Sequence, residues 1–220
     1  MRRSWHRSAG AATVAGLMAL GISGCTTEQE APDYPDVRWV GAAPTGSLER
    51  DPWVGAVRAE LAAEAVARNR NDFSIPELAA SATSSYVDRE SANAVQTLRN
   101  HGSTTLVPGP LPFAPTEVEV GYRDQSEDFA AVRGCVAGNW SMDPGESLGD
   151  MSGFGREYRL ERDHAGVIRV ASVSGLPGLD CDTVGPLPVA VFDPVPEPSG
   201  VTDSGDLVRP DGTRDAPRRG

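Results

Sequence analysis

The sequence predicts a single α+β domain over residues 48–193, with helices first and an antiparallel sheet after them. Stretches before residue 102 repeat apolar side chains every three or four positions, as one face of a helix does. Stretches after residue 115 alternate apolar and polar side chains, as half-buried strands do. Helices followed by a strand meander are typical of α+β domains, and this length is enough for a substantial core.

The first helix is expected from Asp51 to about Arg68. Asp51 suits the N-cap, and the proline after it suits the first helical position. One apolar stripe then repeats every four residues, formed by Trp53, Val57, Leu61 and Ala65. Glu64 and Arg68 add an ion pair four residues apart.

Two further helices are expected before residue 103. Residues 74–77 read Ser-Ile-Pro-Glu, a capping box with proline inside, which opens a short helix through residue 82. Asp88 can cap a third helix that ends at Gly102.

Strands follow the helices. They are expected at 104–107, 116–123, 129–140, 155–162 and 167–174. In 155–162, Tyr158 and Leu160 lie on the face opposite the charged residues Glu157, Arg159 and Glu161. The turn 163–166 joins the last two strands into a hairpin.

Segments on either side of the domain are expected to lack structure. Residues 25–47 are polar and contain prolines, as a flexible tether does, although Trp39 and Val40 suit docking on the domain or at a lipid interface. Residues 194–220 begin with a proline-rich run and then turn charged, which predicts a disordered C-terminal tail.

Residues 1–24 have the three zones of a secretory signal peptide. A basic start with Arg2, Arg3 and Arg7 precedes an apolar stretch and an exit of small residues. The apolar stretch is about a dozen residues long, whereas a membrane-spanning helix needs about 20. We therefore expect export with cleavage of this segment.

The end of this segment, Ile22-Ser23-Gly24-Cys25, resembles the lipobox of bacterial lipoproteins. The resemblance implies cleavage between Gly24 and Cys25 and a diacylglycerol thioether on Cys25, with room for an added N-acyl chain such as palmitate. Two or three acyl chains form a stable anchor. The expected location is the extracytoplasmic face of the cell membrane.

Two cysteines remain in the domain, Cys135 and Cys181. Because an exported protein meets an oxidising compartment, this pair is expected to form a disulfide. A metal site or a reactive thiol is the alternative, and metal is disfavoured because no His or second Cys lies at ligand spacing from either residue.

The chain is acidic, with a net charge of −11, and all 20 of its basic residues are arginine. An acidic chain is not suited to the phosphates of nucleic acid or to a polybasic contact with anionic lipid. The bias towards arginine resembles that of proteins from GC-rich genomes such as those of actinobacteria.

Three features resemble the nuclear transport factor two-like, or SnoaL-like, cone found in small actinobacterial lipoproteins. They are the segment 71–78 between the first helices, the strand 132–136 leading to Trp140, and the later Cys181. The resemblance spans residues 48–185 and implies a curved sheet that encloses a pocket against the first helix. Another arrangement of helices on a sheet is the alternative.

Aromatic side chains are the candidates to line such a pocket. They are Trp53, Tyr86, Tyr122, Trp140, Phe154 and Tyr158. The alternative is that each packs in the core, because a domain of this size must bury its few aromatic residues.

No catalytic constellation is present in the sequence, and no catalytic residue, metal or cofactor is expected. His101 suits a helix end and His164 a hairpin turn. The glycine-rich loop 142–155 carries Asp143, Glu146 and Asp150, but their spacing does not fit an EF-hand. A solvated loop is therefore preferred to a calcium site.

These observations favour a non-catalytic envelope lipoprotein that binds a partner protein or a small ligand. A carrier of lipid or another small apolar ligand is one alternative. An isomerase- or hydrolase-type enzyme that uses the cone pocket is the other, and it predicts a cavity beside a buried Asp, Glu or His with a shifted pKa.

Overall fold

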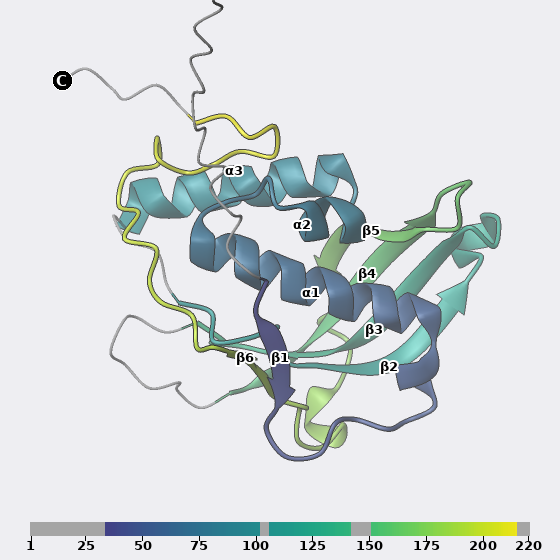
Figure 1. Cartoon of the computed structure of the whole chain (residues 1–220). Coiled ribbons are helices and arrows are strands. Elements are labelled where there is room, and N and C mark those ends of the chain that lie inside the picture. The colour runs from purple at the N-terminus through teal and green to yellow at the C-terminus, as the bar shows by residue number, and fades with distance from the viewer. Residues whose placement is uncertain (1–33, 102–105, 142–150, 215–220) are drawn as a thin grey trace, which may run out of the picture. The chain divides into compact units, whose positions relative to one another are not determined.

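The computed structural model describes residues 34–101, 106–141 and 151–214. Helices pack against an antiparallel sheet in one α+β domain, which confirms the predicted fold class (Figure 1). The predicted signal peptide and Cys25 lie outside the described residues. No helix in the described ranges is long and apolar enough to cross a membrane.

Helix α1, Pro52–Arg70, is the central helix of the domain. Asp51 caps its first turn by accepting a hydrogen bond from the Trp53 amide at 2.8 Å. The helix ends at Asn71, which takes the left-handed conformation (φ 52°) common at helix C-termini. The predicted stripe of Trp53, Val57, Leu61 and Ala65 is buried.

The starts of α2, Pro76–Ser81, and α3, Ser84–His101, differ from the prediction. Ser74 does not cap α2, because its amide and hydroxyl both donate to Asp72 Oδ1, at 2.9 and 2.6 Å. The third helix begins a turn before Asp88, because the Thr83 carbonyl already accepts hydrogen bonds from the next turn.

The sheet has four antiparallel strands in the order β2-β3-β4-β5. They are β2 Phe113–Val120, β3 Phe129–Ala137, β4 Gly153–Arg162 and β5 Ile168–Gly175. The register shifts at Pro115/Glu117 and at Arg159/Leu160, and bulges of this kind bend a sheet. Of the strand expected at 104–107, residues 104 and 105 lie outside the described part of the chain.

The core lies between α1 and one face of this sheet (Figure 1). Val132 and Tyr158 are opposite each other on β3 and β4, and both are fully buried. The Phe113 ring meets the Tyr158 ring edge-on, with centroids 5.4 Å apart. A side chain at Gly134 would collide with Phe113, so the glycine makes room for this aromatic pair.

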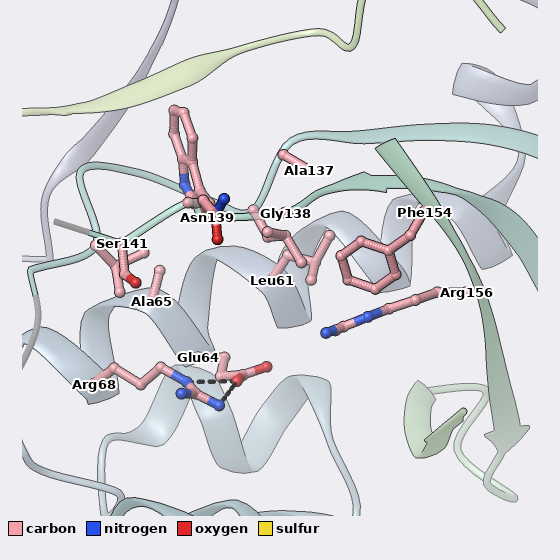
Figure 2. Close-up of a pocket in the computed structure, with 13 residues that line it drawn as sticks. Leu61, Glu64, Ala65, Arg68, Ala137, Gly138, Asn139, Ser141, Phe154 and Arg156 are labelled. Atoms are coloured by element: carbon pink, nitrogen blue, oxygen red, sulfur yellow. Dashed lines mark hydrogen bonds and ion pairs between the residues drawn. The ribbon is translucent and has the colours of Figure 1, made fainter. Parts of the chain in front are cut away.

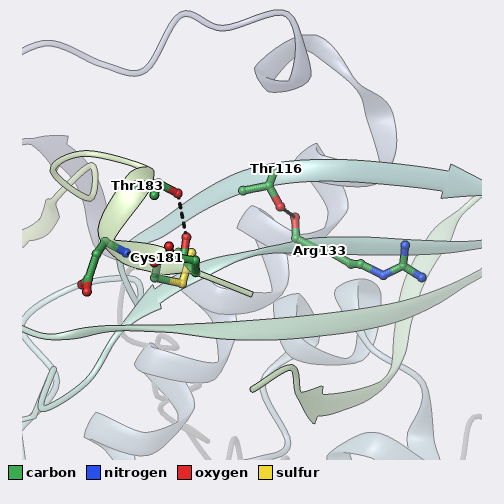
Figure 3. Close-up of a disulfide and its surroundings, with 7 residues drawn as sticks. Thr116, Arg133, Cys181 and Thr183 are labelled. Carbon is green, nitrogen blue, oxygen red and sulfur yellow. Dashed lines mark hydrogen bonds between the residues drawn. A yellow bond between two sulfur atoms is a disulfide. The ribbon is translucent and has the colours of Figure 1, made fainter. Parts of the chain in front are cut away.

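The other face of the sheet carries the disulfide and an ionic cluster. Cys135 of β3 is bonded to Cys181, which begins a short turn, Cys181–Thr183, with a Cα–Cα distance of 5.7 Å (Figure 3). Arg133 on the same face binds three carboxylates, those of Glu117, Glu119 and Glu157, at 2.8–3.0 Å.

Part of the expected tether is a strand. Residues Asp36–Trp39 form β1, which pairs antiparallel with β6, Ala190–Asp193. Trp39 lies under the Arg58 guanidinium of α1, 5.4 Å from its ring centroid. This placement differs from the flexible tether expected over 25–47, because the partner strand lies some 150 residues away in the sequence.

The expected disordered tail also differs from the structure over residues 194–214. Leu207 is 1% exposed and belongs to the main core. Val208 donates to the Asn71 carbonyl and accepts from the Phe73 amide, both at 2.9 Å. Val201 also packs against the core, and the Ser199 hydroxyl accepts a hydrogen bond from the Asn71 side chain at 2.6 Å. A few apolar side chains and hydrogen bonds therefore attach a segment whose composition is otherwise polar.

Candidate functional site

A pocket of about 320 Å³ lies between α1 and the adjoining ends of β3 and β4 (Figure 2). Its wall is about equally apolar and polar. The apolar residues are Leu61, Ala65, Val107, Leu111, Ala137, Trp140 and Phe154, and Asn139 and Ser141 add uncharged polar groups. Three charged residues also line it: Glu64, Arg68 and Arg156. The volume is within the range of small-molecule sites.

Helix and strand periodicity bring these charges together. Glu64 and Arg68 are four residues apart, so they share one face of α1. Phe154, Arg156 and Tyr158 occupy every second position of β4, so their side chains share its helix-facing side. Figure 2 shows Arg156 reaching from β4 towards the helix face that carries Glu64 and Arg68.

Glu64 and Arg68 form a close ion pair. Arg68 Nε donates to Glu64 Oε1 at 2.6 Å, and Arg68 Nη2 also binds Glu90 at 3.0 Å. The Tyr86 hydroxyl donates to the other Glu64 oxygen at 3.2 Å. Burial alone would raise the pKa of Glu64, but the Arg68 guanidinium outweighs it and lowers that pKa. Glu64 is therefore ionised, and Arg68 neutralises its charge.

Arg156 differs from Arg68 because it has no such partner. Among the described residues, no carboxylate lies within 4 Å of its guanidinium. The guanidinium instead lies over the Phe154 ring, 5.1 Å from its centroid. Its positive charge also contributes to the lowered pKa of Glu64. The pocket thus contains one cation that the described chain leaves uncompensated at short range.

A second carboxyl group, that of Glu60, is buried behind the pocket. Glu60 is 0% exposed, and neither of its oxygens has a hydrogen-bond partner in the described residues; the same holds for the Tyr158 hydroxyl. Burial, and then the charge of Glu64, raise the pKa of Glu60 well above its usual value. An unpaired buried carboxylate is costly, so burial favours the neutral acid.

Two of the predicted pocket-lining aromatic residues, Trp140 and Phe154, line this pocket. The Trp140 indole is fixed by donating Nε1–H to the Gly109 carbonyl at 2.8 Å. Trp53 and Tyr158 are buried in the core instead.

The remaining two candidates also lie elsewhere. Tyr86 is buried under α1 and reaches the site only through its hydroxyl on Glu64. Tyr122 lies with the ionic cluster, donating to Glu157 at 3.3 Å. Core packing therefore accounts for these rings better than a pocket does.

The charged residues of the site carry a signal that the sequence analysis did not use. Glu60 follows Val57 by three positions and Leu61 precedes Glu64 by three, so both acids adjoin the buried stripe of α1. Arg156 lies on the core face of β4, the same face as Tyr158 and Leu160, which follow it by two and four positions. A charge at a core-facing position was the available indication of a site.

The other sequence candidates lie apart from the pocket. His164 is exposed in the hairpin turn after β4, and His101 is the last residue of α3. Asp143, Glu146 and Asp150 fall outside the described residues. Within the described ranges, no group of three His, Cys, Asp or Glu side chains could hold a metal ion.

No protein-family profile matches the chain, and no curated protein matches it. The residues of the pocket therefore carry the functional argument. Arg156 and the Glu64–Arg68 pair supply its charges, and apolar side chains supply about half of its wall.

Proposed function

We propose that this protein is an exported, lipid-anchored envelope lipoprotein whose domain binds a small organic anion in the pocket between α1 and β4. The observation that carries the binding function is Arg156, a pocket-lining cation with no carboxylate partner among the described residues. A guanidinium binds a carboxylate or phosphate through two parallel hydrogen bonds, so an anionic ligand satisfies it better than a single water molecule does.

The charge balance of the pocket favours an anion. Among the residues that line the pocket, Glu64 and Arg68 offset each other, so Arg156 gives the lining a net positive charge. Glu90, which also binds Arg68, does not line the pocket. A cationic ligand would have to displace Arg68 from Glu64, at the cost of a short ion pair.

The apolar part of the wall favours an anion that also has an apolar body. Leu61, Val107 and Leu111 contribute aliphatic surface to the wall, and the Phe154 and Trp140 rings contribute aromatic surface. Burying an apolar body against such a wall stabilises a complex by about 25 cal/mol per Å² of buried apolar surface. Binding, without any chemical step, accounts for all of these features.

The location in this proposal rests on the sequence of residues 22–25 and on the signal-peptide pattern before it. Lipid on Cys25 would hold the domain at the extracytoplasmic face of the membrane. The cone-like resemblance to nuclear transport factor two-like lipoproteins agrees with a pocket between the first helix and the sheet. An envelope protein is the alternative partner.

Isothermal titration calorimetry with benzoate tests the binding function, because benzoate combines one carboxylate with one apolar ring. Arg156→Gln is expected to weaken binding by about tenfold or more, since a hydrogen-bonded charge contributes about 1.5–3 kcal/mol. Arg159→Gln is the matched control, because Arg159 is on the same strand but binds Glu157 on the opposite face. Benzoate heats that are equal for the wild type and Arg156→Gln would contradict the proposal.

A second candidate function, acid–base catalysis, is favoured by Glu60 and Glu64. Their pKa values are shifted in opposite directions beside a cavity, as in sites that use one carboxyl as acid and another as base. It ranks second because Glu60 does not line the pocket and Glu64 is already bound by Arg68 and Tyr86. Hydrolysis of p-nitrophenyl acetate that is lost in Glu64→Gln would favour it, and equal rates would exclude Glu64 as the base.

A further inference from the structure

A second, apolar pocket of about 240 Å³ adjoins the first one. It lies between α1, strand β1 and residues 110–111. Both pockets are lined by Leu61 and Leu111, so these two leucines form a wall that the pockets share. A ligand that passes over this wall would occupy both spaces.

From this shared wall we infer that the ligand is a single-chain amphiphile, a medium-chain acyl carboxylate. Its carboxylate binds Arg156 and its tail crosses Leu61 and Leu111 into the apolar pocket beside Trp39. The inference rests on the proposed function, because the same Arg156 site receives the head group.

The lining of the second pocket fits a hydrocarbon tail rather than a second polar group. Val37, Ala59 and Ala62 are among its residues, and the one charged residue that lines it is Arg58. Arg58 is already bound to both oxygens of Glu49, at 2.6 and 2.7 Å, and to the Phe113 carbonyl at 3.2 Å. Its charge is satisfied within the chain, so it offers its methylene stem and its stacking on Trp39.

The outer rim of this pocket leaves apolar surface in contact with solvent. Val37 on β1, which lines this pocket, is 39% exposed. Apolar side chains gathered at an open groove are a feature of ligand or partner sites. A bound tail would remove part of this surface from water.

The test is a calorimetric series of butanoate, hexanoate, octanoate and decanoate in detergent-free buffer. The protein carries Cys25→Ser, so that no acyl chain of its own can compete. Affinity is expected to rise by about fourfold for each methylene that enters the groove. Benzoate, which is too short to cross the two leucines, serves as the reference for the head-group site.

Ala59→Trp fills the groove from an exposed position on α1, and Ala62→Leu is a smaller change with the same aim. In both variants the affinity is expected to rise less steeply with acyl chain length, while benzoate binds as it does to the wild type. Ala80→Trp, exposed on α2, is the control that keeps the full rise.

Three results would overturn the inference, and they are distinguishable. Benzoate binding without any dependence on chain length removes the tail site and leaves the proposed function intact. If affinity depends on chain length in both groove variants as it does in the wild type, the tail binds elsewhere. Failure of every anion, benzoate included, removes the proposed function and the inference with it.

Discussion

Glu60 lies one turn before Glu64 on α1, and the pKa values of the two carboxyl groups are shifted in opposite directions. Glu64 is ionised because Arg68 lowers its pKa against the effect of burial. Burial, and then the charge of Glu64, raise the pKa of Glu60 and favour its neutral form. The groups around Glu60 that carry titratable charge are Glu64, Tyr86, Glu90 and Tyr158.

The raised pKa of Glu60 makes stability depend on pH. In the unfolded chain this carboxyl ionises near 4.5, while in the folded chain it keeps its proton to higher pH. The free energy of unfolding should therefore fall as the pH rises above 4.5, by up to about 1.4 kcal/mol per pH unit for this one proton. The decline ends where the folded Glu60 ionises.

Glu60→Gln removes this titration and should flatten the decline. Urea unfolding between pH 5 and 8 measures this effect, as the difference in the free energy of unfolding between wild type and variant at each pH. Glu90, whose pKa is also raised by burial, is present in both proteins and cancels from that difference. Parallel profiles for the two proteins would show that Glu60 is ionised in the fold.

The disulfide should contribute substantially to stability. Cys135 and Cys181 are 46 residues apart, and the chain-entropy model gives about 4 kcal/mol for such a loop as an upper value. The double variant Cys135→Ala, Cys181→Ala should lose up to that amount in urea unfolding at neutral pH. A urea midpoint equal to that of the wild type would contradict the prediction.

The C-terminal segment should stabilise the fold through Leu207. Truncating this buried side chain with Leu207→Ala should cost roughly 2–5 kcal/mol, the usual loss for a core leucine. Val195→Ala is the control, because Val195 is 69% exposed and its truncation should change the free energy of unfolding by less than about 0.5 kcal/mol. Equal, small losses for both variants would mean that the segment is not docked.

Lipidation of Cys25 predicts that the protein incorporates a fatty-acid label and that it is found with the membranes. Cells grown with radioactive palmitate should incorporate it into the wild-type protein, which should sediment with membranes. Cys25→Ser should carry no label, while Cys135→Ala, Cys181→Ala should carry it as the wild type does. A labelled Cys25→Ser protein would place the lipid on another residue.

Local patterns were sufficient to predict most elements of the fold. The four-residue repeat from Trp53 to Ala65 predicted α1, and the alternation around Tyr158 predicted the core face of β4. These signals are local, because helix and strand periods are set by neighbouring residues. The predicted α2 and α3 began at the wrong residues, since Asp72 and Thr83 make the hydrogen bonds that decide where those helices begin.

Contacts between distant segments were not predictable in this way. Nothing near Val37 indicates that its strand pairs with Phe192, and nothing near Leu207 indicates a place in the core. The pocket is similar: the sequence places Arg156 on the core face of β4, but only the packing of α1 leaves space around it. Trp140 lines the pocket, whereas Tyr86 and Tyr158 are buried in the core.

The most direct measurement of the central claim is the guanidinium resonance of Arg156 in a ¹H–¹⁵N NMR titration with benzoate. The account predicts that the Nε–Hε signal of Arg156 shifts and saturates as benzoate binds, while the signal of Arg159, bound to Glu157 on the other face, stays in place. A titration in which Arg156 does not move, or in which Arg156 and Arg159 move alike, would contradict an anion site in this pocket.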